Sequence, residues 1–430
     1  MIRKFTTLLC GLLITFTALA QEVELSPIEK LEQRTETLES EIIKLKNFKV
    51  SGYIQTQFQS AQTDADGMNF KLANRANAYE QSEELNYGRF GVRRGRIKFT
   101  YEDGLVQGVF QPDFSEKGVS FKDVYLSIKD PWVGTNSLKS GIFDRPFGHE
   151  IAYSSSRRES PERARITQTL FPDERDLGAM LTLQPAKTSV WNILKLEAGL
   201  FVGNGIKPQI SSRMDFIGHL SITKQIGADM VLSGGVSAYL GGLLQTDSST
   251  FVMKDKKYAL ESKSGDNVGK FAKRQYIGFD AQFSAITVAG FTQLRAEYIF
   301  GEHAQNSSGS WDYKFTGIQS GPVYMRKISG GYITLAQDLG ETPFTAVLKY
   351  DWYNPNTEVS GNEVGADNSG TGAKDMSMST FGMGILWRIN PALRLTAYYD
   401  ITKNETSENV KGWDIDRKDD VFTLRLQYRF

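Results

Sequence analysis

The chain has 430 residues, of which 40% are hydrophobic and 12% aromatic, so it can form a folded core and lacks the composition of a disordered protein. Its 50 basic residues balance 50 acidic ones, which argues against a dedicated nucleic-acid-binding protein. With 1 cysteine and 3 histidines, a zinc ribbon, a disulfide framework and a cysteine nucleophile are disfavoured. We therefore expect no nucleic acid, metal or other cofactor among its ligands.

The first 20 residues have the pattern of an export signal. Arg3 and Lys4 give a positive start, residues 5–19 are mostly apolar, and Ala20 ends the small-residue pattern that a signal peptidase reads. We expect cleavage after Ala20, so that residues 1–20 form a signal peptide and the mature chain is exported. No later apolar run reaches the roughly 18 residues that a membrane-spanning helix needs.

Residues 21–47 show the spacing of a coiled coil. Ser26 can cap a helix and Pro27 suits its first position. A narrow stripe at alternating spacings of three and four follows, formed by Ile28, Leu31, Thr35, Leu38, Ile42 and Leu45. Because one such helix is marginal in water, we predict a short N-terminal periplasmic coiled-coil helix that associates with other copies of the chain. The alternative is a solvated helix that packs on its own domain.

From residue 48 onward, apolar and polar side chains alternate at period two, which is typical of β-strands with two different faces. We predict sixteen strands, near residues 48–60, 90–102, 105–114, 120–129, 138–147, 176–186, 191–203, 213–224, 228–241, 274–286, 290–301, 324–337, 343–353, 378–388, 392–403 and 420–430. Most have about ten residues, the length with which a tilted strand crosses a bilayer. We expect the apolar face to contact lipid and the polar face to line a water-filled lumen.

The connections between these strands alternate in length. Gaps on one side are short, such as 225–227 and 287–289, whereas the other side has long gaps rich in Gly, Ser, Asn and Asp, such as 242–273 and 354–377. This rhythm is typical of outer-membrane barrels. A soluble sandwich also alternates, but it explains neither the rhythm nor the aromatic residues near strand ends. We therefore predict an all-β fold, a sixteen-stranded antiparallel transmembrane β-barrel over residues 48–430, with both ends in the periplasm.

Several segments resemble a known family. They are Gly141–Gly148 with Glu150, Phe171–Ala179, Glu297–Gly301, Tyr350–Thr357 and the terminal Tyr428–Phe430. Through them the chain is similar to the phosphate-selective porin O and P family of sixteen-stranded, trimeric channels. The resemblance implies a homotrimer in the lipid of the outer membrane of a Gram-negative-type bacterium, and diffusion of small anions such as phosphate. Phe430 looks like the terminal aromatic signal that the barrel-assembly machinery recognises.

The gap 148–175 lies where such porins fold a loop into the barrel as a constriction. It contains five candidate anion-binding residues, Arg157, Arg158, Arg163, Arg165 and Arg175. Arginine suits phosphate because its planar fork donates two parallel hydrogen bonds. The same gap also contains Glu159, Glu162, Asp173 and Glu174. An ion-paired loop that only braces itself against the wall therefore remains the alternative.

Basic residues at inward strand positions extend this hypothesis to the wall. We assign to the lumen Arg94, Arg96, Lys98, Arg295, Lys349, Arg394, Arg425 and Arg429. Five of them belong to the second and last strands, which come close together once the last strand pairs with the first. The sequence thus predicts a basic stripe on one side of the barrel, rather than a lumen that is positive all round.

These observations favour an outer-membrane porin for passive diffusion of small hydrophilic solutes, with a preference for phosphate-like anions. The alternatives are a non-selective general porin and a closed barrel that serves in binding or adhesion. We do not expect an enzyme, because His149, His219 and His303 show no recognisable serine–histidine arrangement.

Overall fold

The computed structural model describes residues 34, 46–65, 86–116, 118–306, 318–319 and 321–430. The predicted signal peptide and most of the predicted coiled-coil helix lie outside these residues, so both remain predictions. Lys49–Phe430 form a compact unit of their own. In the part of the chain that is described, no helix has the length and apolar character needed to cross a membrane.

The described residues of this unit contain 19 strands in one sheet, and 16 of them form a closed barrel. The wall strands are β1 (Phe48–Gln62), β2 (Asn86–Asp103), β3 (Val106–Ser115), β4 (Gly118–Lys129), β5 (Ser137–Asp144), β6 (Arg175–Leu183), β7 (Leu194–Phe201), β8 (Asp215–Ile226), β9 (Met230–Gln245), β12 (Phe271–Thr287), β13 (Gly290–Asn306), β15 (Val323–Asp338), β16 (Phe344–Asn354), β17 (Met378–Arg388), β18 (Leu393–Asn404) and β19 (Val421–Arg429). Each overlaps one predicted strand, so the predicted barrel is confirmed.

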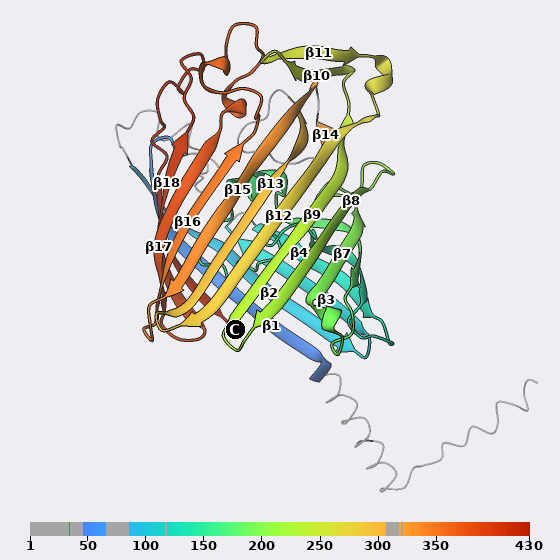
Figure 1. Ribbon diagram of the computed structural model, residues 1–430, viewed down its shortest axis with the longest axis vertical. Helices are drawn as coiled ribbons and strands as arrows, with labels where there is room; N and C mark the ends of the chain where they lie inside the picture. Colours follow the sequence, from blue (N-terminus) through green and yellow to red (C-terminus); the bar gives the residue numbers. More distant parts are fainter. Residues whose placement is uncertain (1–33, 35–45, 66–85, 117, 307–317, 320) are drawn as a thin grey trace, which may run out of the picture. The chain divides into compact units, whose positions relative to one another are not determined.

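The remaining elements lie in connections. They are β10 (Ser249–Lys254), β11 (Lys257–Lys263), β14 (Ile318–Gln319), α4 (Arg165–Leu170), η1 (Val190–Ile193), η2 (Gly265–Asn267), η3 (Gly361–Glu363) and η4 (Ala373–Asp375). Strands β10 and β11 form a hairpin at the end of the barrel that carries the long connections (Figure 1).

Neighbouring wall strands are antiparallel, and the ring closes between the first and the last. Strand β1 pairs with β19 from Tyr53 opposite Arg429 to Ala61 opposite Val421. Short turns, such as 227–229 and 288–289, lie at the same end as the C-terminus (Figure 1). The predicted alternation of short and long connections is therefore present, and it sets the two ends of the barrel apart.

In a soluble protein the apolar side chains face inward and the polar ones face solvent. In the wall of this barrel the arrangement is reversed. Outward side chains in mid-strand are apolar and exposed, as with Leu220 at 51%, Val236 at 47% and Phe279 at 47%. These three are direct neighbours across β8, β9 and β12. The adjacent inward residues His219 and Asp280 are buried and bonded to each other at 2.9 Å. Apolar exposure of this extent is stable only against lipid.

The expectation of a uniformly polar interior is wrong on one side of the barrel. An apolar cluster fills that side, made of Phe143, Phe147, Ile151, Ala164, Ile166, Leu170, Phe171, Met180, Phe201, Ile217, Tyr239, Tyr276, Ile299, Ile328, Tyr332 and Tyr353. Several of these come from the connection between β5 and β6, and α4 in that connection packs against β15 and β16. Inward apolar residues of the wall therefore hold a loop rather than face water.

The outward face gives a direct test of lipid contact. We predict that Val236→Arg lowers the free energy of unfolding from vesicles by about 2–4 kcal/mol, because it puts a charge near the middle of the bilayer. The matched control is Val288→Arg in the turn between β12 and β13, where Val288 is fully exposed, and we expect a change below about 0.5 kcal/mol. Urea titration of tryptophan fluorescence measures both. Equal costs at the two positions would contradict the assignment of the lipid face.

Candidate functional site

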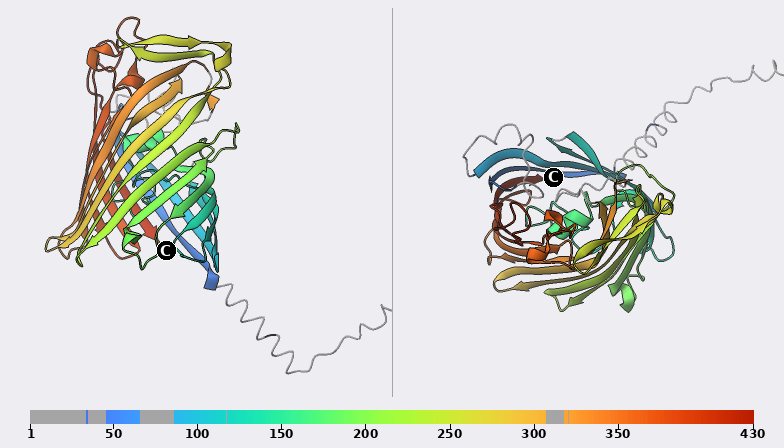
Figure 2. Two further views of the ribbon diagram at one scale, coloured as in Figure 1. Left: turned by 45° about the vertical axis from the view of Figure 1, so that its right-hand side comes forward. Right: turned by 90° about the horizontal axis from the view of Figure 1, so that it is seen from above.

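The connection between β5 and β6, residues 145–174, lies inside the barrel. Seen from above, its helix α4 lies within the ring of strands (Figure 2). Its polar contacts reach both sides of the wall, because Arg295 on β13 pairs with Glu159 whereas Tyr53 on β1 bonds Ser155 at 2.6 Å. We call this segment loop 145–174. The sequence predicted a constriction loop over residues 148–175, and the structure places loop 145–174 inside the barrel, whereas its role as a constriction stays a prediction.

The first residues of loop 145–174 are hydrogen-bonded to a carboxylate of the barrel wall. The backbone N–H groups of His149 and Glu150 donate to Glu297 Oε2 at 3.2 and 3.1 Å. Gly148 has φ +62°, and a Cβ there would lie 1.8 Å from Glu297 Oε1. Both the left-handed backbone and the close approach require glycine at this position.

The opposite wall holds the loop mainly through its carbonyl groups. Arg394 of β18 donates to the carbonyl oxygens of Arg157 and Arg158 at 3.3 and 2.8 Å. Gln427 of β19 donates to the carbonyl of Ser156 at 3.0 Å, and Gln55 of β1 to that of Ser155 at 3.1 Å. These donors turn the loop backbone toward β18, β19 and β1.

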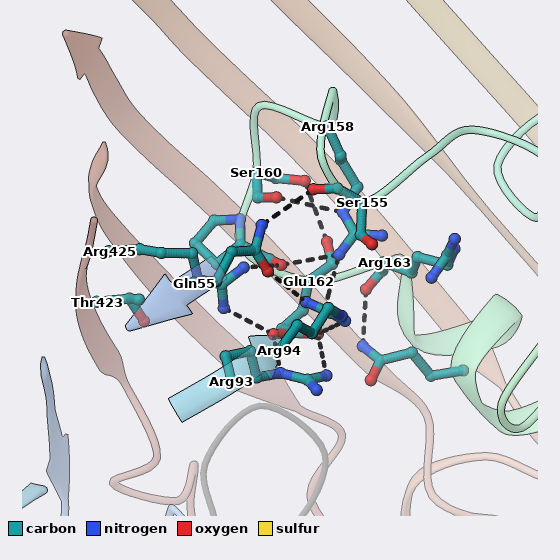
Figure 3. A network of polar contacts seen from close by, with 12 residues as sticks. Gln55, Arg93, Arg94, Ser155, Arg158, Ser160, Glu162, Arg163, Thr423 and Arg425 are labelled. Atoms are coloured by element: carbon teal, nitrogen blue, oxygen red, sulfur yellow. Dashed lines mark hydrogen bonds and ion pairs between the residues drawn. The ribbon is translucent and has the colours of Figure 1, made fainter. Parts of the chain in front are cut away.

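Glu162 is the centre of an arginine cluster on this wall (Figure 3). Arg93 of β2 donates Nε and Nη2 to the two carboxylate oxygens, each at 2.8 Å. Arg425 of β19 donates to Glu162 Oε1 at 2.8 Å, and Arg94 Nη2 lies 3.5 Å from Oε2. Arg158 of the loop is more distant at 4.0 Å. We call these four arginines with Glu162 the arginine cluster.

The arginine cluster carries an excess of positive charge. Four guanidinium groups face one carboxylate, which leaves three positive charges without a carboxylate of their own within this group. Arg94 Nε and Arg158 Nη1 are buried and have no hydrogen-bond acceptor among the described residues. Burial and the charge of Arg163 lower the pKa of Arg158 to about 10, so this guanidinium is still charged at neutral pH.

The carboxylate at the centre stays ionised. Burial by itself raises the pKa of Glu162, but the charges of Arg93, Arg94 and Arg425 outweigh it and hold the pKa well below its usual value of 4.5. The attraction between the Glu162 carboxylate and these arginines therefore has its full strength above pH 4.5. It is lost only as the pH falls toward the lowered pKa of Glu162.

The five predicted loop arginines do not form one site. Arg158 joins the arginine cluster, whereas Arg163 and Arg175 both pair with Glu174, and Arg175 also reaches Asp123 at 3.0 Å. For Arg163 and Arg175 the structure shows the ion-paired arrangement that the sequence left open. Arg157 is exposed and Arg165 half-buried, and no ion pair within 4.0 Å joins either guanidinium group to a carboxylate of the described residues, although the backbone N–H of Arg165 donates to Asp351 Oδ1 at 3.2 Å.

The wall residues predicted to line the lumen lie in different surroundings. Of the predicted basic stripe, Arg94 and Arg425 come together beside β1, where they donate to Gln55 and Gln57. Arg96 pairs with Asp113 at 2.8 Å, and Lys349 lies 3.4 Å from Asp351, so their charges are locally balanced. The other predicted lumen residues differ in burial: Arg295 is buried, Lys98 and Arg394 are half-buried, and Arg429 is exposed at the strand end.

Sequence reasoning missed Arg93 and the role of Glu162. Period two places Arg93 outward, but β2 pairs with β3 only up to Gly95 opposite Phe114, so Arg93 lies beyond that pairing. Its side chain can therefore turn to Glu162. The adjacent pair Arg93-Arg94 at a strand position was the one signal in the sequence, since alternation predicts a single inward arginine there.

Comparisons with known proteins agree with this architecture. The family model described as phosphate-selective porin O and P matches residues 57–430. The outer membrane channel DcaP of Acinetobacter baumannii has a TM-score of 0.52 at 13% identity, and the match covers 89% of this chain and 97% of that one. OmpF of Salmonella typhi, in a complex with daunomycin, has a TM-score of 0.52 at 11% identity and the same coverage. Such low identities show the fold alone. No curated protein sequence matches the chain.

The start of loop 145–174 gives a further prediction. Gly148→Ala adds a methyl group that collides with Glu297, so we expect a loosened loop and a noisier single-channel current in planar bilayers. The control is Gly104→Ala in the turn between β2 and β3, where φ is +56° but nothing lies within 4 Å of the added Cβ. This control carries the same backbone strain without the collision. Equal current noise in the two variants would contradict a role for the Glu297 contact.

Proposed function

The chain belongs to the phosphate-selective porin O and P family and is therefore an outer-membrane porin, and on this premise we propose that it passes small hydrophilic solutes passively and prefers anions, including phosphate-like ones. The observation that carries the proposal is the excess positive charge of the arginine cluster beside loop 145–174. The proposal assigns the chain no catalytic role.

Coulomb's law sets the size of the expected preference. A monovalent ion in water about 8 Å from three positive charges has an interaction energy of roughly 1.6 kcal/mol, which screening at 0.1 M salt reduces to about 0.7 kcal/mol. Because the sign is opposite for cations, the ratio of anion to cation permeability is on the order of tenfold. Arginine also favours oxyanions over halides, because its fork matches two oxygen atoms.

One observation favours the alternative of a closed binding barrel. Loop 145–174 contacts opposite sides of the wall, through Glu159 on one side and Ser155 and Glu162 on the other. A barrel in which these contacts seal the lumen passes no current in a planar bilayer. A general porin passes current but has an anion-to-cation ratio near one. Conductance and selectivity therefore separate all three functions.

The proposal extends to assembly, because part of the wall is short. Strands β5 and β7 have 8 residues each, whereas β12 and β13 have 17 each. Eight residues at a tilt of about 45° span roughly 19 Å, less than the ~25 Å apolar band of such barrels. The outer face of β3, which is separated from β5 by β4, carries Phe110, whose ring lies 5.5 Å from that of Phe121. We assign this wall to contacts with other copies in a homotrimer.

The orientation follows from the short turns. The proposal places these turns and the C-terminus in the periplasm, with the long connections outside the cell. Phe430, exposed at the end of β19, is then the terminal residue that the barrel-assembly machinery reads during insertion into the outer membrane.

Ion selectivity is the first test of the proposed function. With a tenfold KCl gradient across a planar bilayer, we expect a reversal potential of the sign given by chloride permeation, and a ratio that falls toward one when the mean salt concentration rises tenfold, because the charges are screened. A cation-selective reversal potential would refute the anion preference.

Assembly is tested separately, in detergent. We expect multi-angle light scattering of the purified protein to give the mass of three chains after correction for bound detergent. Phe110→Arg is expected to shift this mass toward one chain, because a charge then faces a closely packed apolar interface. A wild-type mass of a single chain at micromolar concentration would contradict the trimer.

A further inference from the structure

We propose that Glu162 is a tethered competitor in an oxyanion site: its carboxylate occupies the place that a small oxyanion, such as phosphate, sulfate or a carboxylate, takes on the basic wall. This inference rests on the proposed anion preference and adds how the site is kept from binding too tightly. The carboxylate of Glu162 stands in for two oxygen atoms of the solute.

The contact between Arg93 and Glu162 has the geometry of oxyanion recognition. Nε and Nη2 of one guanidinium group each donate to a separate oxygen at 2.8 Å, the parallel arrangement that arginine makes with carboxylate and phosphate alike. Arg425 adds a third donor at 2.8 Å. A phosphate or sulfate that replaced the carboxylate would find the same three donors already placed.

The cluster has capacity for more acceptor atoms than Glu162 supplies. Arg94 Nε and Arg158 Nη1 are buried without an acceptor among the described residues, although both side chains are within 4.0 Å of the Glu162 carboxylate. A tetrahedral oxyanion carries four oxygens against the two of a carboxylate. It can therefore accept hydrogen bonds from donors that Glu162 leaves unsatisfied, and it brings further negative charge to the arginine cluster, which has three positive charges in excess.

The backbone around Glu162 is held by hydrogen bonds that do not involve the Glu162 side chain. Lys349 of β16 donates to the Glu162 carbonyl at 3.2 Å, and Arg425 donates to the Pro161 carbonyl at 2.6 Å. Arg394 holds the two carbonyls of Arg157 and Arg158. The carboxylate can therefore leave the cluster while the loop stays attached to the wall.

Competition of this kind suits a channel. Conduction requires a site that binds well enough for the solute to enter and weakly enough for it to leave. A carboxylate tethered beside the site has an effective concentration in the millimolar range or higher, so it returns when the solute departs and shortens the occupancy. Four arginines without this competitor would hold a phosphate for much longer.

The test compares two neutralised glutamates of the same loop. Glu162→Gln removes the competitor, and Glu159→Gln removes the same charge three residues earlier, where Glu159 pairs with the single Arg295 on the opposite wall. Single-channel current in KCl is recorded while phosphate, and then sulfate, is titrated. We expect Glu162→Gln to lower the half-blocking concentration of both oxyanions at least tenfold relative to wild type. We expect Glu159→Gln to change it by less than about twofold.

Several results would overturn the proposal. Equal shifts in the two variants would show a general charge effect, and a larger Glu162→Gln conductance without oxyanion block would show that Glu162 is only a structural tie. If Glu162→Gln does not insert as a heat-modifiable barrel, Glu162→Asp keeps the charge but shortens the reach. We then expect Glu162→Asp to lower the half-blocking concentration of the oxyanions. An unchanged half-blocking concentration would contradict the proposed competition. The ion selectivity of the wild-type protein in the KCl gradient tests the anion preference independently. The anion preference and the role of Glu162 as a competitor can therefore fail separately.

Discussion

The buried attachment of loop 145–174 to both sides of the barrel is the constraint on which the rest of the interior depends. Charged groups buried in this way are costly unless each has partners, and removing one member leaves the other uncompensated. On one side Arg295 and Glu297 hold the loop, and on the other the arginine cluster holds Glu162. The loop position, and with it the path left to a solute, is set by these contacts rather than by the strands alone.

The interior combines two kinds of packing. The apolar cluster with Phe147, Ile166 and Phe171 fixes the loop on one side as a soluble core would, by removing apolar surface from water. The opposite side is polar and arginine-rich. Outside, the same wall is apolar because lipid is its solvent. This division places the arginines of the arginine cluster on the β1, β2 and β19 side of the interior.

The strands could be predicted from sequence, because alternation at period two and the rhythm of short and long connections are local signals. The inward loop was predicted from its length, its arginines and the family resemblance. The partners within it were not, because Glu162 is 69 positions from Arg93 and 263 positions from Arg425 in the sequence and meets them only when the barrel has closed. Net charge gave no hint that one carboxylate would face four arginines. The packing of inward apolar wall residues against the loop was likewise not predictable, because the alternation pattern does not show which segment covers an inward position.

The central claim is that the arginine cluster beside loop 145–174 attracts anions. The most direct measurement is anomalous X-ray diffraction from crystals of the wild-type protein soaked in bromide, with a parallel soak in rubidium. The account predicts a bromide peak within contact distance of Arg94 and Arg158, and no rubidium peak there. Rubidium at that place, or bromide spread evenly along the lumen with none at the cluster, would contradict it.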